Sequence, residues 1–200
     1  MDAPAGCARL RHVSRPAESP LRESLLTAAA DELAANGFSG LRMADVAGRV
    51  GVSRQTVYNE FGTKLGLVQA VALQRTAEYL VGVEQRLVDA PRPFDGMRDA
   101  LTFLLEQAAR DRLVSSVVTG ADAEDLLPFL TTRGLPVLLP ATEVVARQLT
   151  RQWPDLPTEH VRQVAETIVR LALSHLLMPS GTPEQAVDAM LAVAKAALPS

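Results

Sequence analysis

MADVAGRVGVSRQTVYNEFGTK, residues 43–64, predicts two short helices joined by a tight turn. In its first half apolar residues recur at helical spacing, which indicates a helix with one face toward a core. Those residues are Met43, Val46, Ala47 and Val50. Gly51 is suited to end this helix with a positive φ. Ser53 is a good N-cap for a second helix, which we expect to run from Arg54 to about Phe61.

The spacing of Ala47, Gly51 and Val57 is typical of a helix-turn-helix. The small alanine lets the helices cross closely, the glycine makes the turn, and the valine holds the second helix on the first. An ordinary helical hairpin also fits this spacing. The outer face of residues 54–59 favours DNA binding, because it carries hydrogen-bonding side chains without an acid. Those side chains are Arg54, Gln55, Thr56, Tyr58 and Asn59.

The same stretch resembles the N-terminal signature of the TetR (tetracycline-repressor) type of bacterial transcriptional regulator. The resemblance covers about the first third of the chain, and it departs from the family pattern in two places. Leu41-Arg42 stands where the family usually has a capping Ser or Thr, and Arg42 can itself reach a phosphate. Glu60 is expected to point away from a DNA backbone. The matching residues are Asp45-Val46-Ala47, Gly51-Val52-Ser53, Thr56-Val57-Tyr58, Phe61, Lys64 and Leu67.

This resemblance implies an all-α, ligand-responsive DNA-binding regulator, most often a repressor, which binds a palindromic double-stranded operator as a dimer. We expect base contacts and phosphate contacts to come from different side chains. Base contacts are assigned to Arg54, Gln55, Thr56 and Asn59. Phosphate contacts are assigned to Arg42, Ser53, Tyr58 and Lys64. Lys64 opposes the dipole of its own helix unless a phosphate docks there, and a solvated lysine is the alternative.

The composition agrees with an all-α protein, because 48% of the 200 residues are hydrophobic and only 4% are aromatic. We expect a disordered arm over residues 1–18 and a three-helix helix-turn-helix domain over 19–66. A helical effector-binding and dimerisation domain is expected over 67–200. Cys7 is the only cysteine, which excludes an intramolecular disulfide and fits the cytoplasm. No apolar run is long enough to span a membrane, and no secretory signal is evident.

The net charge of −3 is unevenly distributed along the chain. Residues 1–66 carry a small basic excess, whereas the rest of the chain is acidic, so the charge permits DNA binding at the N-terminal end. The arm is either a passive tail or a segment whose arginines follow the DNA backbone or enter a minor groove. Those arginines are Arg9, Arg11 and Arg15.

An enzyme has no support in the sequence. His12, His160 and His175 are far apart and lack the neighbours that a metal site needs. No glycine-rich phosphate loop and no nucleophile elbow are present, so we expect neither a metal nor a cofactor. A helical adaptor protein is the remaining alternative, but it leaves the polar face at residues 54–59 unexplained.

Beyond the helix-turn-helix the periodicity predicts a series of helices separated by proline and glycine. The expected helices cover residues 64–88, 94–110, 111–119, 123–130, 140–153, 158–178 and 182–198. Pro136 and Pro140 predict irregular backbone before the fifth of these. The last two are apolar on more than one face, which predicts a homodimer through residues 158–198. Burial within one chain is the alternative.

Residues 94–153 suit an effector pocket, because short broken helices pack less regularly than long ones. The expected lining is mostly aliphatic, which indicates an apolar or amphipathic small molecule. A solid core is the alternative reading, and a charged effector would need Arg147, Arg170 or Glu143 as its counter-charge. The expected lining residues are Phe103, Leu104, Gln107, Val118, Phe129, Leu138, Thr142, Val145 and Ile168.

Overall fold

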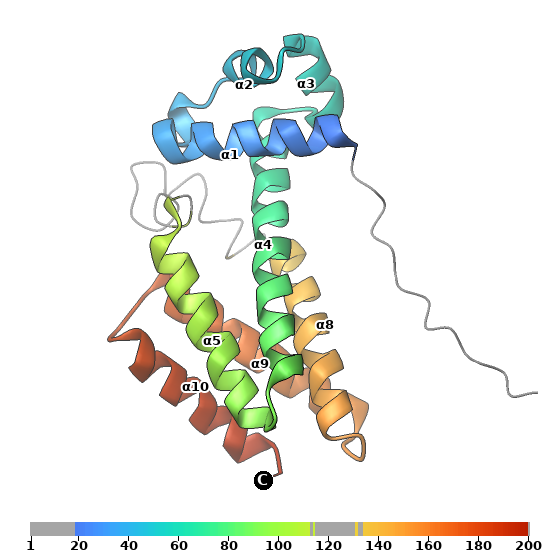
Figure 1. Cartoon of the computed structure of the whole chain (residues 1–200), viewed down its shortest axis with the longest axis vertical. Coiled ribbons are helices and arrows are strands. Elements are labelled where there is room, and N and C mark those ends of the chain that lie inside the picture. Colours follow the sequence, from blue (N-terminus) through green and yellow to red (C-terminus); the bar gives the residue numbers. More distant parts are fainter. Residues whose placement is uncertain (1–18, 113, 115–130, 132–133, 200) are drawn as a thin grey trace, which may run out of the picture.

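The computed structural model describes residues 19–112, 114, 131 and 134–199, and this part of the chain forms eight helices without a strand (Figure 1). The predicted all-α class is therefore confirmed. The arm at residues 1–18 lies outside the described residues. The helix expected at 123–130 also lies outside them. Of the helix expected at 111–119, only Asp111, Arg112 and Val114 are described.

Three helices gather at one end of the molecule, and a long fourth helix runs from them into the remaining helices (Figure 1). The three are α1 (Pro20–Gly40), α2 (Met43–Val50) and α3 (Arg54–Phe61), and the long one is α4 (Lys64–Asp89). Their core holds aliphatic residues of all four, including Leu26, Val46, Val57 and Leu67. Burial of these side chains fixes the angle at which α3 is presented.

The helix ends follow the expected local chemistry. Gly51 adopts φ 74° after α2, and Ser53 Oγ accepts the backbone N–H of Thr56 at the start of α3. Thr63 caps α4 by accepting from Gly66 N–H. Gly37 has φ 69° and breaks α1, and one further turn carries that helix to Gly40.

The other half of the chain consists of α5 (Pro93–Arg110), α8 (Leu135–Gln152), α9 (Thr158–Leu177) and α10 (Pro183–Ala197). Their main core joins α5, α9 and α10 through apolar side chains such as Leu101, Ile168 and Met190. A smaller cluster joins α8 to α9. Thr182 and Gln185 form a complete capping box at the start of α10.

The start of α8 corrects a prediction. We expected irregular backbone up to Pro140, but the helix begins at Leu135 and includes both prolines. Pro136 lies in the first turn, where its missing N–H would have had no partner within the helix. Pro140 removes one hydrogen bond, whose acceptor would be the carbonyl of the exposed Pro136. Water can bind that carbonyl, so the helix tolerates the second proline.

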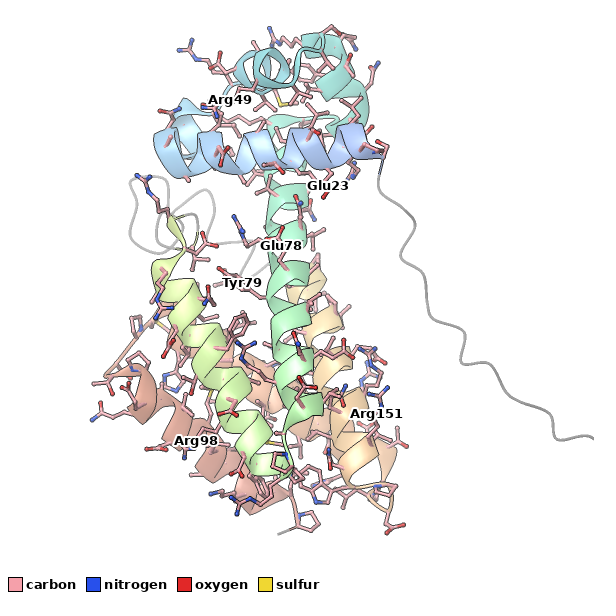
Figure 2. The ribbon with its side chains drawn as sticks, viewed as in Figure 1. Glu23, Arg49, Glu78, Tyr79, Arg98 and Arg151 are labelled. Carbon is pink, nitrogen blue, oxygen red and sulfur yellow. The ribbon has the colours of Figure 1, made fainter. Side chains whose placement is uncertain are left out.

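The long helix α4 belongs to both hydrophobic cores. Val68 and Val71 lie in the core of α1–α3, whereas Leu87 packs on the core of α5, α9 and α10. Glu78 and Tyr79 lie on the stretch of α4 between these two regions (Figure 2). A displacement in one half of the molecule can therefore reach the other through α4. None of the described helices has the length and apolar character needed to cross a bilayer.

Candidate functional site

The helix α3 presents a polar surface to solvent. Its one fully buried side chain is Val57, which has no exposed area and packs on α1 and α2. Arg54, Gln55 and Asn59 are exposed, and Thr56 and Tyr58 are partly exposed. The side chains expected to reach base edges thus share the free side of one short helix.

These side chains hold one another in place along α3. Arg54 Nη2 donates to the hydroxyl of Tyr58 over 3.0 Å, and its guanidinium lies 5.1 Å from the centre of that ring. Gln55 Nε2 donates to Asn59 Oδ1 over 2.8 Å. Each pair is separated by four residues, one helical turn. The polar face is therefore ordered before any partner arrives, which lowers the entropy cost of binding.

The remaining expected phosphate contacts surround α3. Arg42 is exposed at the N-cap of α2 and makes no side-chain capping bond there. Lys64 contacts its own domain, because its ammonium lies 4.5 Å from the Phe38 ring centre and donates to the carbonyl of Ser39 over 3.3 Å. That contact offsets the misfit of a cation in the first turn of α4. It also leaves the side chain at the junction of α1, α3 and α4.

Glu60 is neutralised by α1. Its carboxylate accepts from Arg22 Nη1 over 2.6 Å, and the Arg22 guanidinium lies 4.8 Å from the centre of the Phe61 ring. The acid on the last turn of α3 is thus paired with a cation from the start of α1.

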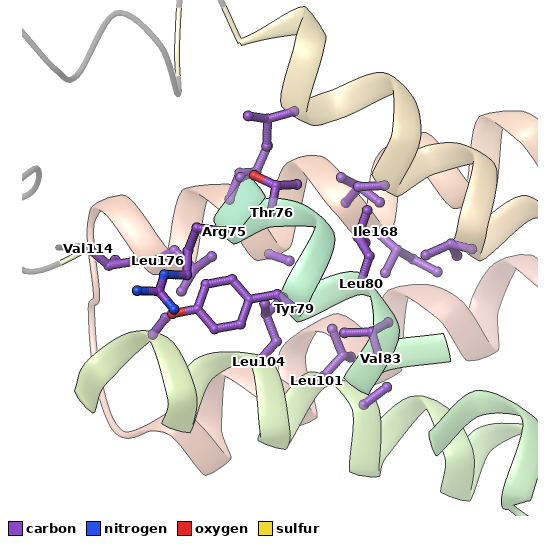
Figure 3. Close-up of a pocket in the computed structure, with 18 of the residues that line it drawn as sticks. Arg75, Thr76, Tyr79, Leu80, Val83, Leu101, Leu104, Val114, Ile168 and Leu176 are labelled. Atoms are coloured by element: carbon purple, nitrogen blue, oxygen red, sulfur yellow. The ribbon is translucent and has the colours of Figure 1, made fainter. Parts of the chain in front are cut away.

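A cavity of about 190 Å³ lies between α4, α5, α8 and α9 (Figure 3). For comparison, an engineered apolar cavity of 150 Å³ binds benzene. Its walls are mostly aliphatic, and Leu33 of α1 joins Val68 and Val71 of α4 in lining it. These three residues also belong to the core of α1–α3, so one cavity touches the cores of both halves. The other lining residues include Leu80, Val83, Leu101, Leu104, Leu149, Ile168, Ala172 and Leu176.

One end of this cavity is polar. Arg75 and Tyr79 lie side by side there, away from Leu101 and Ile168 (Figure 3). The Tyr79 hydroxyl donates to Asp111 Oδ2 over 2.5 Å, and Arg75 Nε lies 3.2 Å from the same carboxylate oxygen. Burial and the bond to Asp111 raise the pKa of Tyr79, so the phenol stays protonated near neutral pH. Asp111 ends α5, and these contacts therefore join α4 to the end of α5.

Three of the expected pocket residues line the cavity, namely Leu104, Val145 and Ile168. The structure places four others elsewhere. Phe103 lies against Gly82 and Arg86 on the other side of the α4–α5 contact, and Gln107 lines a separate surface groove. Leu138 and Thr142 are buried in α8, and Thr142 Oγ1 has no hydrogen-bond partner within the described residues. Val118 and Phe129 lie outside the described residues.

Sequence reasoning missed the polar lining of the cavity, which consists of Arg75, Thr76, Tyr79 and Gln148. A signal was present, because Arg75 and Tyr79 are one helical turn apart and flank the apolar stripe of α4. The three charged residues proposed as counter-charges, Arg147, Arg170 and Glu143, do not line the cavity.

Comparison with known protein families finds a match for each half of the chain. Residues 25–71 match the family profile described as bacterial regulatory proteins, tetR family. Residues 93–196 match the profile described as bacterial tetracyclin repressor, C-terminal domain. The chain belongs to the TetR family. Members of this family are DNA-binding transcriptional regulators that bind small-molecule effectors and act as dimers.

Individual TetR-family relatives extend over most of the chain. The HTH-type transcriptional regulator AlkX of Mycobacterium tuberculosis (strain ATCC 25618 / H37Rv) is 35% identical over 161 residues, which are 80% of this chain and 76% of that protein. The crystal structure of the TetR-family repressor AlkX from Dietzia sp. strain DQ12-45-1b, implicated in biodegradation of n-alkanes, aligns with a TM-score of 0.74. It is 30% identical and covers 90% of this chain and 95% of its own.

A more distant structure shares the fold. RolR in complex with resorcinol aligns with a TM-score of 0.65 at 20% identity, over 88% of this chain and 91% of its own. The two AlkX proteins are described as a transcriptional regulator and a repressor, and the RolR structure shows only that the fold is shared.

Proposed function

We propose that this chain is a cytoplasmic repressor that binds a palindromic operator as a homodimer and releases it when an apolar or amphipathic molecule binds. The cavity is the observation that carries this proposal, because it is largely apolar and is lined by residues of both hydrophobic cores. We further propose that residues 19–66 act as the DNA-binding domain and residues 67–200 as the effector-binding and dimerisation domain.

The DNA contacts in this proposal follow the surface of α3. Arg54, Gln55, Thr56 and Asn59 read base edges, and Arg42, Ser53, Tyr58 and Lys64 hold phosphates. The support is their exposure and the ordered i, i+4 pairs along α3. Arginine and glutamine or asparagine are the side chains best suited to paired hydrogen bonds with guanine and adenine.

The dimer in this proposal forms through residues 158–198. Small apolar residues lie exposed on α10 at helical spacing, and Val193 among them is 42% exposed. Such a stripe allows close approach of a second helix. The exposed side of α9 is more polar and carries Arg162, Thr167 and Arg170. The exposed stripe of α10 consists of Ala189, Ala192, Val193 and Ala196.

Release requires a ligand that binds two conformations with different affinity. Leu33 supplies a physical route, because it lines the cavity and is 1% exposed in the core beneath α3. The Dietzia relative is implicated in biodegradation of n-alkanes, which suit an aliphatic cavity of this kind. Linear ten-carbon molecules are therefore the first ligands to test.

The experiment is a fluorescence-anisotropy titration with labelled DNA from upstream of the protein's own gene, combined with sedimentation to count protomers. We expect two protomers per palindrome and weaker binding when decan-1-ol is added. A variant with Arg54, Gln55 and Thr56 changed to Ala serves as the control and should bind neither this DNA nor its half-site. A monomer at micromolar concentration that still binds the operator would contradict the dimer. Full affinity of the triple variant would contradict the contact assignment.

A further inference from the structure

We propose that Arg75 and Tyr79 form a polar subsite, which receives the oxygen-bearing head group of a single-chain amphiphile whose hydrocarbon tail fills the rest of the cavity. The inference rests on the proposed effector function and specifies the class of ligand at the same site. It assigns a hydroxyl, carbonyl or carboxylate head to one end of the cavity.

The first step is to ask which polar side chains of the lining have hydrogen-bonding capacity left. Thr76 Oγ1 donates to the carbonyl of Ala72 over 2.8 Å. Gln148 is 3% exposed, its amide nitrogen donates to Glu84 over 3.3 Å, and its amide oxygen accepts from Arg151 over 3.4 Å. Both side chains are therefore engaged with their own surroundings.

Arg75 and Tyr79 differ from these two. Arg75 binds Asp111 through Nε over 3.2 Å and Glu78 through Nη1 over 2.8 Å. Within the described residues its Nη2 donates no hydrogen bond. Tyr79 donates its proton to Asp111, which leaves the phenol oxygen able to accept. Together the two side chains offer a ligand one donor group and one acceptor.

The position of this pair also suits a head group. Arg75 and Tyr79 line the internal cavity on one side and a shallow polar groove with Asp31, Gln107 and Asp111 on the other. The Arg75 side chain is 38% exposed, so a head group bound there keeps contact with water. The opposite end of the cavity is formed by aliphatic residues such as Leu101 and Ile168 (Figure 3).

Burial energetics then fix the orientation of an amphiphile. A hydroxyl or carboxylate placed among the aliphatic residues would lose its water hydrogen bonds without replacement, which is strongly unfavourable. The same group at Arg75 and Tyr79 keeps at least one strong hydrogen bond. The tail gains by leaving water for the aliphatic wall. The head therefore binds at the Arg75–Tyr79 end and the tail extends away from it.

The test measures the binding of decane, decan-1-ol and decanoate, each below its micelle or solubility limit, by calorimetry on the full chain. The variants are Tyr79→Phe and Arg75→Met, and the matched control is Arg86→Met. Arg86 lies on the same helix but stacks on Phe103, 3.7 Å from the ring centre, and does not line the cavity. Decane leaves water more readily than the other two ligands, so absolute affinities cannot be compared between ligands. The ratio of variant to wild-type affinity is therefore compared for each ligand separately.

We expect Arg75→Met to weaken decan-1-ol and decanoate roughly tenfold, as for one lost hydrogen bond to a charged partner, and to leave decane unchanged. Tyr79→Phe should weaken decan-1-ol, whose hydroxyl can donate to the phenol oxygen, and should leave decanoate and decane unchanged, because a carboxylate has no proton to donate. Arg86→Met should change none of the three. Tyr79→Phe keeps the ring and decides the matter if Arg75→Met does not fold. Equal binding of decan-1-ol to wild type and Tyr79→Phe would overturn the subsite. Failure of wild type to bind any of the three would instead overturn the apolar-effector proposal, and the subsite with it.

Discussion

Arg22 at the start of α1 and Glu60 on the last turn of α3 form an ion pair, with 2.6 Å between guanidinium nitrogen and carboxylate oxygen. The same arginine stacks on Phe61. The end of the presented helix is thus attached to α1, and the one acid on that helix is paired.

The Arg22–Glu60 pair predicts different effects on stability and on DNA binding. Arg22→Met should lower the free energy of unfolding by less than about 1 kcal/mol, because both side chains are partly exposed. It should weaken DNA binding more clearly, since the unpaired carboxylate of Glu60 then leaves an uncompensated negative charge on the helix that binds the DNA. Adding Glu60→Gln should restore most of the affinity. Urea unfolding and anisotropy measure the two effects, and a double variant no better than Arg22→Met would refute this account.

Lys64 and Asn59 predict two distinct kinds of loss. Lys64→Ala should weaken binding to all DNA sequences and reduce the slope of log affinity against log salt by about one unit. Asn59→Ala should leave that slope unchanged and relax preference at a single base position, as should Gln55→Ala. Titrations of specific and scrambled DNA at several salt concentrations separate the two. An unchanged slope for Lys64→Ala would show that its contact with Ser39 and Phe38 is its whole role.

The sequence predicted the helix-turn-helix well because its signals are local. Gly51 and Ser53 each fix a helix end through their own backbone or side chain, and the structure confirms both. The polar end of the cavity was harder to predict from the sequence, because it depends on which face of α4 packs against the end of α5. Arg75 meets Asp111 across 36 positions of sequence, and no local pattern specifies such a pair. The prediction of irregular backbone up to Pro140 was wrong for a related reason. The energetic cost of a proline inside a helix depends on whether the carbonyl that loses its hydrogen-bond donor can bind water.

Two helical glycines predict opposite effects of the same substitution. A Cβ at Gly66 would lie 2.3 Å from the backbone carbonyl oxygen of Phe61, where α4 passes the end of α3. Gly66→Ala should therefore destabilise by roughly 1–3 kcal/mol. Gly48 in α2 has open space around it, so Gly48→Ala should stabilise by roughly 0.5–1 kcal/mol. Thermal and urea melts measure both, and equal shifts of the same sign would contradict the close approach.

Two buried alanines of α9 test whether the cavity has room for added side-chain atoms. Ala172 lines it, whereas Ala165, two turns earlier, has no exposed area and does not line it. Ala172→Leu should change stability by less than about 1 kcal/mol, because the cavity accepts the added atoms. Ala165→Leu should cost roughly 1–3 kcal/mol by overpacking. Similar losses in both variants would indicate a solid core at Ala172.

The dependence of operator affinity on ligand concentration tests most directly the central claim, which is that the cavity controls DNA binding. The measurement is anisotropy of labelled operator with wild type and with Ala172→Leu, over a series of decan-1-ol concentrations. We predict that the ligand weakens wild-type binding and that the operator weakens ligand binding by the same factor, as linkage requires. Ala172→Leu should hold the operator at every ligand concentration. Release of Ala172→Leu at the wild-type midpoint, or tight ligand binding that leaves wild-type affinity for the operator unchanged, would contradict the claim.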